Sequence, residues 1–233
     1  AQLAKENVHQ YTPMAGYPPL MNKIAKLTQS SYNRIINPET ELLITAGATQ
    51  GIFTTILALV KENDEVIILD PSYDSYESPV LLCNAKPVRV ALNDDYTPNW
   101  ERIEKAFSAK TRMMIINNPH NPTGKILTEN DFIKLKNLLE KYPDIIVLSD
   151  EVYEYFTFDE KHISAHTKDF LLERCVMVSS FGKSFHITGW KIGYTIAPEH
   201  LMKEIKKVHQ FLVFSVNSIS QFAINEYLDV VDV

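Results

Sequence analysis

The stretch Ile145-Ile146-Val147-Leu148-Ser149-Asp150-Glu151 decides the fold class. Its first four residues are aliphatic without alternation, a pattern typical of a strand buried on both faces of a parallel sheet. The run then ends in two acids, which lie at the carboxyl end of the predicted strand. Because ligands of open α/β sheets bind at that edge, this one stretch predicts both a fold class and the place of a site.

Six further short apolar runs alternate with amphipathic segments of helical length. The other predicted strands are 42–45, 66–69, 88–91, 113–116, 176–179 and 192–197. The predicted helices are 19–30, 49–61, 75–85, 100–108, 129–141, 199–211 and the segment from 218 to the end. Thr128 and the acids after it mark the start of the helix at 129. Such alternation predicts an α/β fold with a largely parallel sheet and right-handed crossovers.

Composition and charge exclude several classes of protein. The 233 residues carry 23 basic and 29 acidic side chains, a net charge of −6 with no Lys/Arg block, which argues against binding to nucleic acid or an anionic membrane. Cys83 and Cys175 form no CxxC pair, which excludes a disulfide scaffold and a cysteine-based zinc site. No apolar run approaches the roughly 18 residues of a membrane span, and no signal peptide is visible. These features predict a cytoplasmic protein.

The chain divides into two unequal parts. Residues 1–40 are polar and interrupted by prolines, so we expect an N-terminal arm with a first helix, followed by one large domain over 41–233. The chain begins at Ala1 without Met and ends at Val233 inside an apolar run. We therefore expect it to be a fragment of a longer protein.

Polar residues gather directly after five of the predicted strands. The five segments are Ala46-Gly47-Ala48-Thr49-Gln50-Gly51, Asp70-Pro71-Ser72-Tyr73, Asn117-Asn118-Pro119-His120-Asn121-Pro122-Thr123-Gly124, Asp150-Glu151-Val152-Tyr153 and Ser180-Phe181-Gly182-Lys183-Ser184. Since the carboxyl ends of parallel strands share one edge of a sheet, we expect these segments to line a single cleft.

Several familiar motifs fail on inspection. Gly182-Lys183-Ser184 resembles the end of a P-loop, but that motif requires glycine at the position of Met177. The segment Gly47 to Gly51 lacks the GxGxxG spacing of a dinucleotide site. His162 and His166 are four residues apart without an acidic third ligand, so we expect them to be surface residues rather than metal ligands.

Three segments in register resemble one family. The run 179–194 (Ser-Ser-Phe-Gly-Lys-Ser-Phe-His-Ile-Thr-Gly-Trp-Lys-Ile-Gly-Tyr) is similar to the cofactor-lysine segment of class I/II pyridoxal-phosphate aminotransferases of fold type I. Residues 118–124 and 149–153 match the other two signatures of that family. The resemblance covers essentially the whole chain. It implies the large domain of fold type I, a three-layer α/β/α structure with a mostly parallel seven-stranded sheet, and a C-terminal small domain that we expect to lie outside this chain.

The resemblance implies roles for four residues around the pyridoxal ring. Lys183 would hold the cofactor as an aldimine and then move the proton between the substrate α-carbon and the cofactor. Asp150 would pair with the pyridinium nitrogen, while Tyr153 and Asn121 would donate hydrogen bonds to the phenolic oxygen. Simpler interpretations stay open from the residues alone: a solvated lysine for Lys183, a helix N-cap for Asp150 and an Asx turn for Asn121.

A second set of residues would hold the cofactor's phosphate and ring face. Ala48 and Thr49 lie at a predicted helix N-terminus, where free amides and the helix dipole favour an anion. Ser180 adds a hydroxyl and Lys191 a charge, at a position where most of the family has arginine, whose bidentate fork lysine lacks. Tyr73 would stack on the pyridine ring, although an aromatic residue in a turn can equally belong to the core.

The resemblance implies a two-step transamination in a homodimer. An amino acid would donate its amino group to the cofactor, and a 2-oxo acid would receive it. Lys191, the opening Tyr11-Thr12…Gly16-Tyr17-Pro18-Pro19 and Val208-His209-Gln210 point to the kynurenine, glutamine and methionine aminotransferase branch, and hence to methionine, aromatic or kynurenine-like donors. Tyr11 would reach the other subunit's phosphate site, or else pack within its own subunit.

Two alternatives remain open at this point. A C–S β-lyase of the same fold would use the same lysine, aspartate and tyrosine, and a non-catalytic pyridoxal-phosphate-binding module would use the fold without turnover.

None of the five arginines lies in the motif context of the family's substrate-carboxylate arginine; they are Arg34, Arg89, Arg102, Arg112 and Arg174.

Overall fold

Seven strands form one sheet in the order β1-β7-β6-β5-β4-β2-β3 in the computed structural model, which describes residues 5, 8–158 and 161–231. The strands are β1 (Leu42–Thr45), β2 (Glu65–Asp70), β3 (Lys86–Ala91), β4 (Thr111–Asn117), β5 (Ile146–Asp150), β6 (Cys175–Ser180) and β7 (Gly193–Ile196). Strand β7 is antiparallel to both of its neighbours, β1 and β6, and the other pairs are parallel. The mostly parallel seven-stranded sheet is therefore confirmed.

The helices alternate with these strands. They are α1 (Pro18–Tyr32), α2 (Pro38–Glu41), α3 (Ala48–Leu59), α4 (Glu77–Leu82), α5 (Trp100–Ala106), α6 (Glu129–Lys141), α7 (Phe181–Ser184), α8 (Glu199–Leu212) and α9 (Ser218–Tyr227). Short 3-10 turns are η2 (Asp74–Tyr76), η3 (Ala165–Thr167), η4 (Asp169–Leu171) and η5 (Thr188–Trp190). Helix α6 has the predicted bounds because Thr128 and Asp131 form a capping box at its start.

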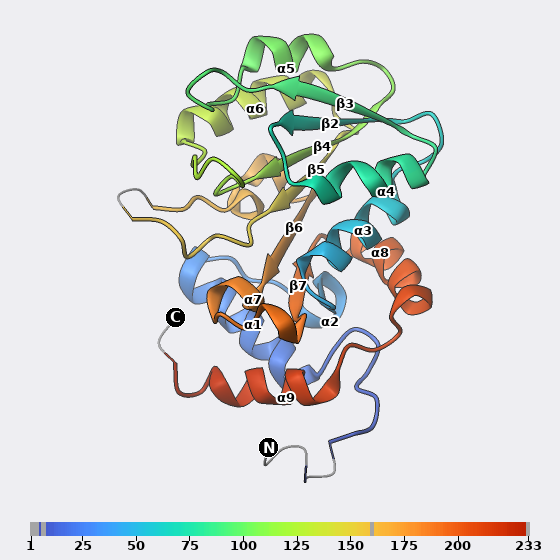
Figure 1. Ribbon diagram of the computed structural model, residues 1–233, viewed down its shortest axis with the longest axis vertical. Helices are drawn as coiled ribbons and strands as arrows, with labels where there is room; N and C mark the ends of the chain where they lie inside the picture. Colours follow the sequence, from blue (N-terminus) through green and yellow to red (C-terminus); the bar gives the residue numbers. More distant parts are fainter. Residues whose placement is uncertain (1–4, 6–7, 159–160, 232–233) are drawn as a thin grey trace.

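One face of the sheet is covered by α3, α4 and α8 (Figure 1). Successive residues of each central strand point to opposite faces, so Val66 and Ile68 of β2 enter the core on this side. Ile146 and Leu148 of β5 do the same. The near-continuous apolar runs of the sequence are explained by this two-sided burial.

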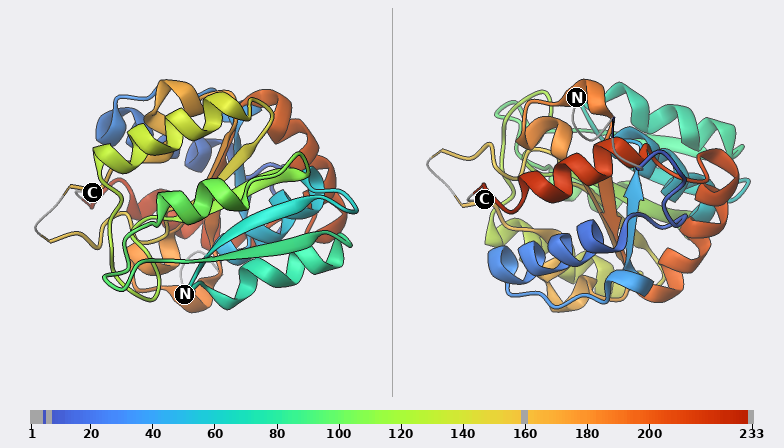
Figure 2. Two further views of the ribbon diagram at one scale, coloured as in Figure 1. Left: turned by 90° about the horizontal axis from the view of Figure 1, so that it is seen from above. Right: turned by 90° about the horizontal axis from the view of Figure 1, so that it is seen from below.

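The other face carries two groups of helices. Helices α5 and α6 pack over β2, β4 and β5, where Ile67 and Val147 are fully buried. Helices α1 and α9 lie side by side over β1, β6 and β7, as the view from below shows (Figure 2). Residues Leu20 and Ile24 of α1 are buried in that part of the core. The sheet thus has helices on both faces, which confirms the three-layer α/β/α architecture.

The register of the strands brings five loops to one edge of the sheet. Asn117 at the end of β4 pairs with Asp150 at the end of β5. Toward the β1 end of the strand order, Gly193 of β7 pairs with both Thr45 of β1 and Ser180 of β6. The loops after β1, β2, β4, β5 and β6 consequently surround one space.

No helix in the described part of the chain is long and apolar enough to span a bilayer.

Candidate active site

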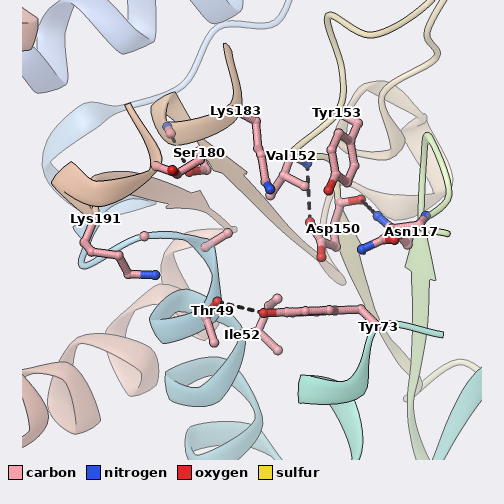
Figure 3. A pocket seen from close by; sticks show the side chains of 15 residues that line it. Thr49, Ile52, Tyr73, Asn117, Asp150, Val152, Tyr153, Ser180, Lys183 and Lys191 are labelled. Carbon is pink, nitrogen blue, oxygen red and sulfur yellow. Dashed lines mark hydrogen bonds between the residues drawn. The ribbon is translucent and has the colours of Figure 1, made fainter. Parts of the chain in front are cut away.

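A pocket lies at this edge of the sheet, with a volume of about 730 Å³ when its open mouth is included (Figure 3). Every one of the five predicted strand-end segments contributes to its wall. The lining residues are Gly47, Ala48, Thr49, Ile52, Tyr73, Asn117, Asn121, Asp150, Val152, Tyr153, Ser180, Gly182, Lys183, Thr188 and Lys191. Nine of the ten predicted site residues are in this set, and Tyr11 is the exception.

Lys183 enters the pocket from the short helix α7. Ser180 caps the first turn of this helix, because its Oγ accepts a hydrogen bond of 3.1 Å from the amide of Gly182. The Lys183 ammonium lies 5.5 Å from the centre of the Tyr153 ring. In Figure 3 its side chain extends toward Asp150 and Tyr153, so the loop after β6 presents a primary amine to the loop after β5.

Asp150 is a buried carboxylate held by two donors. It is 3% exposed, its Oδ2 accepts a 2.7 Å hydrogen bond from the Tyr76 hydroxyl, and its Oδ1 accepts one of 3.3 Å from the Val152 amide. Burial raises the pKa of Asp150 to about 6, and the two hydrogen bonds and the charge of Lys183 oppose this rise. A buried acid of this kind is suited to pairing with a cation inside the pocket.

Asn117 connects two of the predicted site residues, although it was not itself predicted to have a role in the site. Its Nδ2 donates a 2.8 Å hydrogen bond to the backbone carbonyl of Asp150. Its Oδ1 accepts a hydrogen bond of 2.6 Å from the amide of Asn121. Asn117 therefore fixes Asn121 relative to Asp150. The signal that could have identified it is its place at the end of β4, in register with Asp150.

The opposite end of the pocket is built for an anion. Helix α3 begins at Ala48 after Gly47, which has φ +78°, and no side chain among the described residues caps this helix. The amides of Ala48 and Thr49 point out of the first turn, where a helix cannot bond them itself. Lys191 adds a cation: a Cβ placed on Gly47 would lie 3.4 Å from its Cε and Nζ. Free amides, a helix dipole and a lysine meet at one point.

The two predicted aromatic contacts differ in position. Tyr73 lines the pocket, with its hydroxyl 3.3 Å from Thr49 Oγ1. Tyr11 is 79% exposed and lies outside the pocket, with its ring edge-on to Phe214 at 5.3 Å between centroids. Tyr73 therefore belongs to the site of its own chain, whereas Tyr11 contributes nothing to that site.

The prediction that His162 and His166 lie on the surface is wrong. They are 7% and 3% exposed, because both pack behind the site against Glu151, which is fully buried. His162 Nε2 is 2.9 Å from a Glu151 oxygen. Burial alone would raise the pKa of Glu151 and lower that of His162, but the contact between them reverses both directions, giving a buried ion pair.

The other two members of this buried cluster are His166, which is neutral at pH 7, and Glu154; hydroxyl groups contact both of them. Burial lowers the pKa of His166 to about 4, and its Nδ1 lies 3.0 Å from Ser164 Oγ. Burial also raises the pKa of Glu154, whose carboxylate accepts hydrogen bonds from Ser179 at 2.6 Å and from Tyr32. His162 is held by Glu151, and Glu154 by Ser179 and Tyr32, so the spacing of four residues between the two histidines could not show their burial.

Comparison with known proteins agrees with this geometry. Residues 1–232 match the family described as aminotransferase class I and II. The chain is 40% identical to a methionine aminotransferase from Escherichia coli over 96% of this chain and 58% of that protein. It is 37% identical to kynurenine–oxoglutarate transaminase 3 from Bos taurus over 91% of this chain and 49% of that protein.

A solved structure shows the same fold. A crystal structure of an Escherichia coli protein identified as a methionine aminotransferase superposes with a TM-score of 0.95 and 39% identity, covering 98% of this chain and 61% of that one. The chain thus spans about half to three fifths of the length of the relatives it matches. By the match of nearly its whole length, the chain belongs to the class I and II aminotransferase family.

Proposed function

We propose that the protein is a pyridoxal-phosphate-dependent aminotransferase that transfers the amino group of methionine, aromatic or kynurenine-like amino acids to a 2-oxo acid. The observation that carries the proposal is the meeting of Lys183, Asp150, Asn121 and Tyr153 in one pocket whose far end is an anion site. The names of the similar proteins support the choice of donors. The proposal places the protein in the cytoplasm.

The pocket fits pyridoxal phosphate in both charge and layout. The unpaired first-turn amides of α3, together with Lys191 and Ser180, suit a phosphate dianion. Asp150, at the other end, is buried and lacks a salt-bridge partner among the described residues. It therefore suits a protonated ring nitrogen. When bound, the cofactor supplies an electron-accepting ring that stabilises the electron pair left on the substrate α-carbon.

The chain's own residues would carry out four tasks. Lys183 Nζ would hold the cofactor at its aldehyde carbon and, when substrate occupies that carbon, would move the proton between the substrate α-carbon and the cofactor. Asp150 keeps a proton on the ring nitrogen. The Tyr153 hydroxyl and Asn121 amide donate hydrogen bonds to the phenolic oxygen, and Asn117 fixes Asn121 for that purpose. Tyr73 offers an aromatic face to the ring.

Selection of the amino donor is assigned to groups outside this pocket. None of the five arginines lines it: Arg34 pairs with Glu41, for example, and Arg89 with Asp70 and Glu77. We propose that the group binding the substrate carboxylate lies in the part of the related proteins that this chain does not span. The chain then comprises an arm with the first helix (residues 1–40) and a cofactor-binding large domain (41–233).

We also propose a homodimer as the functional unit. Tyr11 is exposed and meets the exposed Phe214 edge-on, so the arm and the loop after α8 together offer an apolar surface that a second copy would cover. Tyr11 would then reach the partner's phosphate site. A monomer in sedimentation equilibrium at micromolar concentration, with cofactor bound, would contradict this part of the proposal.

An amino-donor scan tests the proposed reaction. Full-length protein with pyridoxal phosphate is given methionine, phenylalanine, kynurenine or aspartate together with several 2-oxo acids, and the new amino acid is measured. We expect transfer from the first three donors and little from aspartate. Release of pyruvate and a thiol from a cysteine conjugate, without amino transfer, would instead show a C–S β-lyase.

A further inference from the structure

Tyr76 is a buried tyrosine that touches the site from behind. It is 3% exposed, packs in the core beside Val80 and Leu148, and does not line the pocket. Its hydroxyl nevertheless donates a 2.7 Å hydrogen bond to Asp150 Oδ2. A buried hydroxyl group is costly without a hydrogen-bond partner, and for Tyr76 that partner is the Asp150 carboxylate.

The turn η2 gives Tyr76 a fixed direction. Tyr73 and Tyr76 are three residues apart, and the Tyr76 amide donates a hydrogen bond of 3.3 Å to the Tyr73 carbonyl. Their rings meet edge to face, with centroids 5.6 Å apart and an angle of 87° between planes. One turn therefore presents Tyr73 to the pocket and Tyr76 to the carboxylate that borders it.

Two charged side chains act on Asp150 in addition to the Tyr76 hydroxyl. Glu151 and Lys183 act on Asp150 in opposite directions, the first raising and the second lowering the pKa of the Asp150 carboxyl. Tyr73 and Tyr153 are the other titratable neighbours of this pair. Burial and the Asp150 charge raise the pKa of Tyr76 well above its ordinary value, so Tyr76 is protonated and donates to Asp150 at neutral pH.

We propose that Tyr76 is a positioning residue, which orients Asp150 and limits its affinity for the proton of the cofactor's ring nitrogen. This inference rests on the proposed function. The hydrogen bond stabilises the carboxylate form of Asp150, and its loss makes the carboxylate a stronger base. The proton shared by Asp150 and the ring nitrogen then moves toward Asp150, and the ring accepts electrons less well.

The test uses holoenzyme reconstituted with ¹⁵N-labelled pyridoxal phosphate. In Tyr76→Phe we expect the ¹⁵N resonance of the ring nitrogen to move toward the unprotonated position, and kcat to fall about tenfold with KM little changed, the size of one lost hydrogen bond to a charged group. Tyr194→Phe is the matched control. Tyr194 is also a buried tyrosine (4% exposed), but its hydroxyl lies 3.3 Å from Glu154 rather than Asp150.

A second variant tests the opposite direction and does not depend on the stability of Tyr76→Phe. A fluorinated tyrosine at position 76 keeps the shape but is a stronger donor, so the ¹⁵N resonance should move toward the protonated position. An unchanged resonance in both variants, or an equal change in Tyr194→Phe, would overturn the inference. If these proteins still bind the cofactor, that result leaves the proposed function intact. A wild-type protein that binds no cofactor would instead contradict the proposed function itself.

Discussion

Lys191 shows what a single residue contributes to the site. Its side chain lies against Gly47 beside the first turn of α3, where the helix dipole favours an anion. We predict that Lys191→Ala weakens binding of pyridoxal phosphate about tenfold or more, because one charge-assisted contact is lost. Lys191→Arg should retain binding.

Pyridoxal, which lacks the phosphate, separates this role from general damage. Its affinity should be the same in wild type and Lys191→Ala, and Lys207→Ala, at an exposed lysine paired with Glu204, should affect neither ligand. Titration of each ligand by absorbance measures the affinities. Equal losses for pyridoxal and its phosphate in Lys191→Ala would refute the assignment of Lys191 to the phosphate.

Individual residues were predictable where chemistry follows a strand. Lys183, Asp150 and Asn121 stand directly after apolar runs, so their gathering at one edge follows from the parallel sheet. Tyr76 and His162 were not predictable in this way. Their partners, Asp150 and Glu151, belong to other segments of the sequence, and no local pattern records such contacts.

At the scale of elements, Gly193 sets how closely β7 approaches the anion site. A Cβ at this position would lie 2.6 Å from the Ser179 carbonyl and 3.0 Å from the Ala48 amide, both of them backbone atoms that cannot turn away. We predict that Gly193→Ala lowers the free energy of unfolding by about 1–3 kcal/mol, the usual cost of overpacking. It should also weaken cofactor binding by displacing the start of α3.

Gly189→Ala is the matched control. Gly189 is close in sequence, but a Cβ there would meet no atom within 4 Å. Urea denaturation measures the free energy of unfolding of both variants, and absorbance titration measures cofactor affinity. A Gly193→Ala protein as stable as Gly189→Ala, with unchanged affinity, would show that the loop and strand have room that the structure does not give them.

The bounds of elements were predictable to different degrees. Helix α6 was located correctly because its capping box marks the first turn in the sequence. The predicted helix 75–85 is instead the turn η2 followed by α4 (Glu77–Leu82). Pro79 explains the break, since proline lacks an amide proton and is accommodated only in the first turn of a helix. Helix α2 was missed because its four residues are too few to show a period.

At the scale of the whole molecule, buried histidines make stability depend on pH. Burial lowers the pKa of His166 to about 4 in the folded chain, against about 6.5 when unfolded. The unfolded state then binds more protons between these values, so the folded state loses stability as pH falls from 6.5 to 4. We expect His166 to contribute about 3 kcal/mol to this loss.

His166→Asn tests that contribution, because asparagine keeps a polar atom near Ser164 but does not titrate. Urea denaturation of apoprotein from pH 7.5 to 4.5 should show a flatter loss of stability than in wild type. His200→Asn, at an exposed histidine, should follow wild type. Parallel curves for wild type and His166→Asn would contradict the role of His166.

The proposed chemistry as a whole depends on Lys183 as the attachment point of pyridoxal phosphate. The most direct measurement reconstitutes the full-length protein with the cofactor, reduces it with borohydride, digests it and locates the added mass by peptide mass spectrometry. We predict that the visible absorption band disappears on reduction and that the mass lies on Lys183, with none in Lys183→Ala. A cofactor mass found on Lys191 or on surface lysines, with Lys183 unmodified, would contradict the account.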